Sequence, residues 1–477
     1  MSARIYLACA VTAILAGCAV GPRYVAPATP PTAKTPFVGA QNASDLSEQP
    51  LPAHWWRLYQ DPVLDALVQK ALSQNDNLKT AQANLIYAQD LLREARDGRF
   101  PTTTLTATGA FGRTFLPTKL LTTPRTFELA GFNAAYQLDI FGRITRAIQA
   151  ASANARAVAA ARDVVAVTVA AQTAGAYANI CGYGEQMAAA NQSLAIVQKT
   201  YDLTVIQRNA GALSDFDVAR EAVILNQAKA QVPPLDGARR ANLFILAALV
   251  GETPANVPPE VAGCERPPQL AQPIPVGDGA ALIRRRPDVR EAESNLAAAT
   301  ANIGVATAEL YPTITLGGGY SAGAQSPAGL GNINNATYSV GPVISWSIPN
   351  ILIARDRIRE AGAQAQAALA TFDGAVLTAL SETEQALATY GAELNHHAAL
   401  LAAQKAANDA LTPANTQFQA GGYSFLDQLT VQSTAVGANQ ALAQSDQALA
   451  ADQIAVFQAL GGGWEDAPAV KLLPAPK

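Results

Sequence analysis

The sequence predicts a fold of the α plus membrane β class, in which two tandem repeats each combine long helices with a pair of β-strands. Three observations predict it. Segments that lie about 210 residues apart share one pattern of residues. Short segments that follow a proline alternate with a period of two. Two helical runs, of which the second contains one proline near its end at Pro413, are also far longer than the helices of an ordinary compact domain.

The repeat is clearest where a helical pattern, which runs from about 63 to 99 in the first copy, ends at Pro101 and where a helical pattern ends again, 211 positions later, at Pro312. Apolar residues before each proline recur with the 3,4 spacing of a coiled-coil seam. Proline ends such a run because it lacks the amide proton and clashes with the preceding turn. The seam residues are Leu78, Ala81, Leu85, Ala88, Leu92 and Ala95 in the first copy and Val289, Ala292, Leu296, Ala299, Ile303 and Ala306 in the second.

Four β-strands are predicted after these prolines, at about 102–112 and 127–140 in the first copy and at 313–323 and 336–348 in the second. Tyr338, Val340 and Trp346 share an apolar face of the last strand, and the opposite face is mainly small and polar. Such segments are typical of transmembrane β-barrels; a soluble antiparallel sheet packed on one face is the alternative. Because even eight strands enclose only side chains, four strands cannot surround water, and a pore requires several chains.

Very long helices are predicted to follow the strands and to return after a tight turn. At ~1.5 Å per residue, each outgoing helix would reach roughly 100 Å. The outgoing and return helices are expected at 143–210 and 217–250 in the first copy and at 351–420 and 427–460 in the second.

The turns at 209–217 and 419–427 have matching sequences. Gly211 and Gly421 suit the left-handed conformation that ends a helix. Ser214 and Ser424 suit the N-cap of the helix that returns.

The N-terminus predicts export. Arg4 precedes a short apolar run and then small residues, the layout of a secretory signal over residues 1–17. Leu-Ala-Gly-Cys at 15–18 resembles the lipobox of bacterial lipoproteins, which predicts a covalent lipid on Cys18 and no other cofactor. An ordinary signal peptide with a chance cysteine is the alternative. No unbroken run of about 20 apolar residues occurs, which excludes a spanning helix on this criterion.

The mature chain is expected to begin with a lipidated extended segment at 18–60, whose Pro-, Ala- and Thr-rich composition does not favour a core. Cys181 and Cys264 remain once Cys9 leaves with the signal and Cys18 is lipidated. In an exported protein such a pair predicts a disulfide, and two buried free thiols are the alternative. The remaining segments are repeat 1 at 61–251, an equatorial linker at 252–280, repeat 2 at 281–462 and a tail at 463–477.

Several motifs occur together in this chain. Besides the lipobox and the paired turns, Trp55-Trp56 precedes Asp61-Pro62, and Arg-Arg-Arg-Pro-Asp occupies 284–288. In this combination the chain resembles the TolC-like outer-membrane factors of Gram-negative efflux systems, and within them the NodT-type lipoproteins. The resemblance implies a homotrimer in which four strands per chain build one 12-stranded β-barrel in the outer membrane. A long α-helical barrel would continue it through the periplasm.

The resemblance also implies a function and partners. It predicts a passive exit duct for small molecules, such as drugs, toxic compounds or metal ions. A periplasmic adaptor protein and an inner-membrane transporter of the resistance-nodulation-division class would deliver them, and outer-membrane lipid would surround the barrel. A type I secretion duct for polypeptides and a structural periplasm-spanning lipoprotein are the alternatives. The alternating strands argue against the second, since a spacer has no use for a lipid-facing sheet.

In this family the two turns form the periplasmic tip, where the adaptor docks and the channel narrows. Asp217 and Asp427 match the family's turn aspartates, so three chains would place a ring of carboxylates near the axis. Such a ring would bind cations and act as a gate. The alternative interpretation is structural, because Ser214 with Asp217 and Ser424 with Asp427 also have the spacing of helix capping boxes.

Other chemistry finds little support in the sequence. A net charge of −4 offers no basic face for nucleic acid, and no serine, cysteine or carboxylate pair has the neighbours that catalysis requires. We therefore predict no enzyme. His396 and His397 point about 100° apart on a helix, which predicts a solvated face and no metal site. The arginines at 284–286 are expected to pair with Glu291 or Glu293.

Overall fold

The computed structural model describes residues 19–28, 35–40, 45–112, 115–116, 119–120, 125–257, 259–346, 351–420, 422–465 and 467–468. The predicted signal peptide, Cys18 and Gly421 therefore lie outside the described residues. Two compact units form, and each draws on both repeats. Unit 1 contains Met1–Pro27, Leu85–Val158 and Ala292–Phe372, and unit 2 contains Ala28–Asn84, Ala159–Glu291 and Asp373–Lys477.

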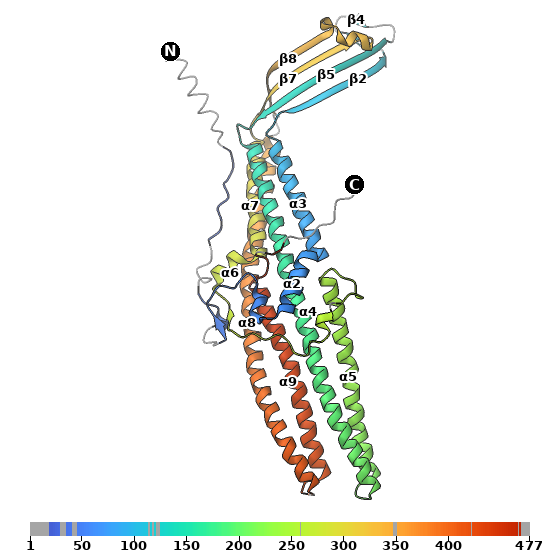
Figure 1. Ribbon diagram of the computed structural model, residues 1–477. Coiled ribbons are helices and arrows are strands. Elements are labelled where there is room, and N and C mark those ends of the chain that lie inside the picture. Colours follow the sequence, from blue (N-terminus) through green and yellow to red (C-terminus); the bar gives the residue numbers. More distant parts are fainter. Residues whose placement is uncertain are drawn as a thin grey trace. The chain divides into compact units, whose positions relative to one another are not determined.

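Unit 1 contains a four-stranded antiparallel sheet (Figure 1). Its strands are β2 (Thr102–Gly112), β5 (Arg125–Leu138), β7 (Thr313–Ala324) and β8 (Ala336–Ser345). The order is β2-β5-β7-β8, so each repeat contributes one hairpin and the two hairpins join where β5 pairs with β7. A small hairpin of β3 (Phe115–Leu116) and β4 (Lys119–Leu120) lies between β2 and β5 in the sequence.

Two strands end earlier than the alternation predicts. The second strand ends at Leu138 rather than 140 because Asp139 caps the next helix, α4 (Arg143–Asn209). The Asp139 carboxylate accepts hydrogen bonds from the backbone N–H groups of Ile144 and Thr145, at 2.8 and 2.7 Å. The last strand ends at Ser345, and residues 347–350, which the prediction included in part, lie outside the described residues.

The helical run predicted from 63 to 99 is two helices, α2 (Pro62–Gln74) and α3 (Asp76–Asp97). The break is Asn75, whose backbone is extended and whose side-chain oxygen accepts from the N–H groups of Asn77 and Leu78. Asparagine favours such a cap because its short side chain reaches the free N–H groups of the first turn. The apolar seam named above begins at Leu78, after this break, which is why its periodicity does not reveal the break.

The same break occurs in the second repeat, where Arg286 separates α6 (Gly279–Arg285) from α7 (Pro287–Ala308). Arg286 stands 211 positions after Asn75. Both side chains donate to the last carbonyl of the return helix of their repeat. Asn75 Nδ2 lies 3.0 Å from the Leu249 oxygen of α5 (Asp215–Leu249), and Arg286 Nη1 lies 2.9 Å from the Ala459 oxygen of α9 (Phe425–Ala459).

The ends of both return helices pack tightly against these breaks. Gly251 and Gly461 follow α5 and α9 in the left-handed conformation, with φ of +74° and +68°. A Cβ at Gly251 would come within 2.7 Å of the Gln74 oxygen, and one at Gly461 within 2.8 Å of Arg286 Cγ. Glycine is required at both positions by conformation and by space.

The outgoing helices are α4, with 67 residues, and α8 (Ile351–Gln419), with 69. At ~1.5 Å per residue each is about 100 Å long. Among the described helices, α4 alone contains a stretch that is apolar enough on average to cross a membrane, although no unbroken apolar run marks it. Within the protein, 67% of that stretch is buried. Packing against other helices therefore accounts for its composition.

Part of the segment expected to be an extended tether is folded into unit 2. A short helix, η3 (Trp55–Tyr59), buries Trp55 and Trp56 completely. Trp55 stacks on Phe457 of α9 with ring centroids 4.6 Å apart. Farther towards the N-terminus, β1 (Leu46–Ser47) pairs in parallel with β6 (Ile274–Pro275) of the linker. The aromatic residues provide the apolar area that the surrounding Pro- and Ala-rich sequence lacks.

Candidate functional site

The sheet of unit 1 has one apolar and one polar face, and the strand register keeps them separate. Leu105, Phe132, Tyr320 and Tyr338 form one continuous row across all four strands. The next row, on the opposite face, consists of Thr104, Asn133, Gly319 and Ser339. The side chains of the first row are 46% to 85% exposed, although they are large and apolar. An exposed apolar face of this kind is suited to contact with lipid.

The two turns of unit 2 carry the predicted capping boxes. Ser214 Oγ accepts from the Asp217 backbone N–H, and the Asp217 carboxylate accepts from the Ser214 backbone N–H at 3.0 Å. Ser424 and Asp427 repeat this arrangement, with the N–H to carboxylate distance at 3.1 Å. Each box satisfies N–H groups that have no partner inside the helix. Gly211, which precedes the first box, has a φ of +79°.

Both turn aspartates remain charged down to low pH. The Ser214 hydroxyl and backbone N–H donate to the Asp217 carboxylate and lower its pKa below the ordinary value of 3.8, and Arg220 adds to this. The Ser424 hydroxyl and backbone N–H lower the pKa of Asp427 in the same way. Hydrogen bonds to the ionised form have this effect because they are lost on protonation. The two carboxylates thus cap their helices and remain available as negative charges at the turns.

Large apolar side chains are exposed beside both capping boxes. Phe216 and Leu426 occupy equivalent positions one residue before the aspartates, and they are 68% and 55% exposed. Tyr423 is also exposed in the second turn. The sequence analysis did not single these residues out, although their equivalence in the two repeats is visible in it. Exposed apolar groups at a helix turn are typical of surfaces that bind another protein.

The linker between the repeats is covalently bonded to α4. Cys181 of α4 and Cys264 of the linker form a disulfide in the structure. Arg239 of α5 donates to the carbonyl oxygens of Ala262 and Cys264, at 2.6 and 2.9 Å. Gly184 leaves room for this approach, because a Cβ there would lie 2.3 Å from the Cys264 oxygen. The linker thus lies directly on α4 at this point.

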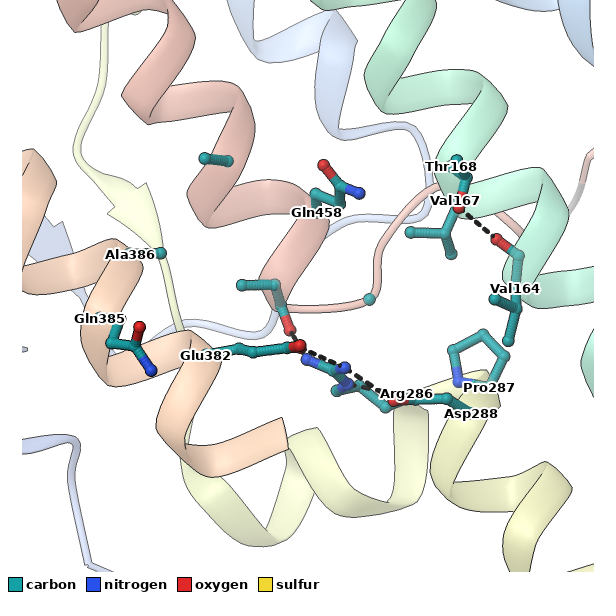
Figure 2. Close-up of a pocket in the computed structure, with 13 residues that line it drawn as sticks. Val164, Val167, Thr168, Arg286, Pro287, Asp288, Glu382, Gln385, Ala386 and Gln458 are labelled. Carbon is teal, nitrogen blue, oxygen red and sulfur yellow. Dashed lines mark hydrogen bonds and ion pairs between the residues drawn. The ribbon is translucent and has the colours of Figure 1, made fainter. Parts of the chain in front are cut away.

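Arg286 is the centre of a cluster of charged side chains in unit 2. This cluster lines a cavity of about 430 Å³ (Figure 2). Its guanidinium lies 2.7 Å from the carboxylates of both Asp288 and Glu382, and it also donates to the Ala459 carbonyl. Figure 2 shows the guanidinium between the two acids. Only 8% of the residue is exposed. An arginine can serve three acceptors at once because its five donors are fixed in one plane.

The expected partners of the arginine run were wrong. Arg286 pairs with Asp288 and Glu382, and Arg285 pairs with Glu465 at 2.7 Å. Glu293 instead accepts a hydrogen bond from Tyr24. The sequence gives no local signal for Glu382, which lies 96 positions from Arg286. A signal for the cap was present, because Arg286 aligns with Asn75 across the repeat, and Asn is a common helix cap.

The interpretation of His396 and His397 as a solvated face holds for only one of them. The side chain of His396 is 60% exposed, whereas that of His397 is 21% exposed and its Nε2 lies 2.7 Å from Asp446 Oδ1 of α9. Among the described residues, no group of three or more His, Cys, Asp and Glu side chains is placed to hold a metal ion.

The chain is similar over most of its length to known outer-membrane channels. Nodulation protein T of Rhizobium leguminosarum bv. viciae is 28% identical over 452 residues, which cover 94% of this chain and 92% of that protein. The solvent efflux pump outer membrane protein SrpC of Pseudomonas putida is 29% identical over 469 residues, which cover 94% of this chain and 96% of that protein. The solved structure of the outer-membrane channel OprN matches with a TM-score of 0.87 and 31% sequence identity. The match covers 94% of this chain and 100% of the OprN chain.

The profile of the family described as "Outer membrane efflux protein" matches residues 67–252 and 280–462. The two matched segments correspond to the two repeats and together cover more than half of the chain. The members of this family are channel or transport components of the outer membrane. The chain belongs to the outer membrane efflux protein family.

Proposed function

We propose that three copies of this chain form one 12-stranded barrel that serves as the exit duct of a tripartite efflux system. As a member of its family, the chain is an outer-membrane channel component of efflux. The sheet is the main support for an assembly of several chains. Its apolar face is exposed, and its outer strands, β2 and β8, each lack a second partner among the described strands. Hydrocarbon does not tolerate unpaired backbone groups, so these edges require neighbouring chains.

The substrates proposed for this duct are small molecules. Solvent and toluene efflux proteins of P. putida and a pyoverdine export protein of P. aeruginosa are 28% to 29% identical to the chain. An inner-membrane pump of the resistance-nodulation-division class and a periplasmic adaptor would supply these molecules, and the duct itself would be passive. Phe216 and Leu426 are the side chains that we expect the adaptor to cover, because they are exposed and apolar in both turns. Cys18 would carry the lipid anchor.

The lipid-facing assignment is tested by two neighbouring residues of β5. We expect Phe132→Arg to destabilise the membrane-inserted protein by about 2–4 kcal/mol, the cost of an arginine near the middle of the lipid face of a barrel. Asn133→Arg lies on the opposite face and should change stability much less, because it would point into the lumen. The measurement is unfolding by urea in phospholipid vesicles, together with ion conductance of both variants in planar bilayers. Equal losses of stability in the two variants would contradict this assignment of the faces.

The gate is proposed from the turn aspartates, of which three chains would bring six together. We expect Asp217→Asn with Asp427→Asn to reduce the preference of the pore for cations, because asparagine keeps the cap and removes the charge. Since the pKa of each aspartate lies below 3.8, the wild-type preference should persist from pH 7 to about pH 4 and fall only at lower pH. Single-channel reversal potentials in a salt gradient measure this preference for cations. A cation preference that is the same in the double variant and in the wild type would leave the aspartates as caps only.

A further inference from the structure

A cavity of about 570 Å³ in unit 1 is surrounded by arginines. Arg23, Arg96, Arg146 and Arg156 line it, together with Ala19, the residue that follows the predicted lipidation site. Arg146 is only 3% exposed, and the other three are exposed. This concentration of positive charge stands out in a chain whose net charge is −4.

The charge on Arg146 has no acidic partner within the part of the chain that the structure describes. Its Nε and Nη2 donate to the backbone oxygens of Val20 and Gly21, at 3.0 and 2.9 Å, and its Nη1 donates to the side-chain oxygen of Gln149. These acceptors satisfy the donors but leave the buried positive charge uncompensated. Such a charge is costly unless an anion lies nearby.

Nearby acidic groups are already engaged. Glu293 accepts a hydrogen bond from Tyr24, which also lines the cavity, at 3.0 Å. Asp139 caps the first turn of α4 through the backbone N–H groups of Ile144 and Thr145. Arg156 donates to the hydroxyl of Ser152, which is neutral. Because four arginines and, among the described residues, no acidic residue line the cavity, it keeps an excess of positive charge.

The N-terminal segment is fitted closely to this cavity. Val20 donates to the Phe141 carbonyl at 3.2 Å. Gly142 has a φ of +76°, and a Cβ there would lie 2.5 Å from the Ala19 Cα. A Cβ at Gly304 of α7 would lie 2.8 Å from Arg146 Cδ. Two glycines thus make room for the N-terminal segment and for the buried arginine, which shows that the arrangement depends on specific residues.

The cavity is lined by residues of α3, α4 and α7, and Figure 1 shows the ends of these helices next to the sheet of unit 1. Arg96 is in the last turn of α3, shortly before β2 begins at Thr102. Arg146 is in the first turn of α4, shortly after β5 ends at Leu138. With the apolar face of the sheet in the outer membrane, the end of the sheet that adjoins these helices would lie near the phosphate groups of the periplasmic leaflet.

We propose that this cavity binds the phosphate of an anionic phospholipid of the periplasmic leaflet. Guanidinium groups bind phosphate oxygens through paired, charge-assisted hydrogen bonds, and basic pockets between membrane helices bind anionic headgroups. A zwitterionic headgroup fits less well, because its ammonium group would face the arginines. The proposal goes beyond transport and requires only that the sheet lies in the outer membrane.

Calorimetric titration of the full chain in neutral detergent tests the proposal. Three ligands are compared: dihexanoyl phosphatidylglycerol, dihexanoyl phosphatidylcholine and inorganic phosphate. We expect the phosphatidylglycerol to bind at least tenfold more tightly than either of the others. The triple variant Arg23→Gln, Arg96→Gln and Arg156→Gln should weaken its binding by about fivefold per arginine removed. Arg146 is left in place because it supports the fold.

Arg93→Gln is the matched control, because Arg93 also lies on α3 but pairs with Asp90 and does not line the cavity. It should change the affinity less than twofold, and the triple lysine variant at 23, 96 and 156 should retain most of the binding. Bilayer conductance of the triple glutamine variant should equal that of the wild type, which separates this site from the duct. Equal affinity of the wild type and the triple glutamine variant would overturn the proposal, as would phosphate binding as tightly as the lipid.

Discussion

Reduction of the Cys181–Cys264 disulfide should lower the free energy of unfolding of the chain by about 4.5 kcal/mol. The bond joins residues 83 positions apart, and a cross-link of this span removes that much conformational entropy from the unfolded chain. The measurement is urea unfolding in detergent, followed by the helical circular dichroism signal, with and without dithiothreitol. The two samples have the same sequence, so no side chain is lost.

The double variant Cys181→Ala and Cys264→Ala is the companion experiment. It should unfold at about the same urea concentration as the reduced wild type and should not respond to dithiothreitol. Arg266→Ala is a matched control in the same linker segment, since its contact with Glu185 at 3.6 Å is largely exposed on the arginine side. The Arg266→Ala substitution should lower the free energy of unfolding only slightly, because exposed ion pairs contribute little. If oxidised and reduced wild type unfold at the same urea concentration, the cross-link contributes nothing measurable to stability, which would contradict the prediction.

Arg286→Ala should destabilise the protein by about 3 kcal/mol. The substitution leaves Asp288 and Glu382 without their cation and the end of α9 without its cap, and breaking a buried ion pair from one side typically costs 3–5 kcal/mol. A destabilisation at the lower end of this range is expected because half of the Glu382 side chain is exposed to solvent. Thermal unfolding in detergent measures the change.

Two further variants separate the contributions of this arginine. Arg286→Asn copies Asn75, the residue at the equivalent break of the first repeat, and should recover about 1 kcal/mol if it restores the cap. Arg284→Ala changes an exposed arginine two residues away and should have little effect. Were Arg286→Ala to unfold at the same temperature as Arg284→Ala, the cluster would contribute nothing measurable to stability.

The sequence predicts the repeat, the strands and the turns because each depends on residues close together in the chain. Pro101 and Pro312 end helices by local geometry, and the alternation around Tyr338 and Val340 shows a two-faced strand without reference to its partners. The capping boxes at Ser214 and Ser424 are also local, since both members of a box lie within three positions. For such features the chain's own spacing contains the necessary information.

The features that sequence reasoning missed depend on residues far apart. The pairing of Arg286 with Glu382, and the packing of Trp55 on Phe457, join segments that only the folded chain brings together. The break at Asn75 was missed for another reason: the apolar seam begins only at Leu78, after it, and the role of Asn75 as a cap and as a donor to Leu249 is seen only in the folded chain. The cavity lined by Arg23, Arg96 and Arg156 likewise collects charges that are scattered in the sequence.

In the proposed barrel, neighbouring strands would be joined in two ways, either within one chain or between two chains. The pairs β2-β5, β5-β7 and β7-β8 form within the chain, whereas β2 and β8 each lack a second partner among the described strands and would pair with a neighbouring chain. Insertion into the bilayer and oligomerisation would then be a single event, because a lone subunit would leave two rows of amides in hydrocarbon. The barrel wall would contain strand pairs within one chain and strand pairs between chains, and harsh detergent should separate it at the latter.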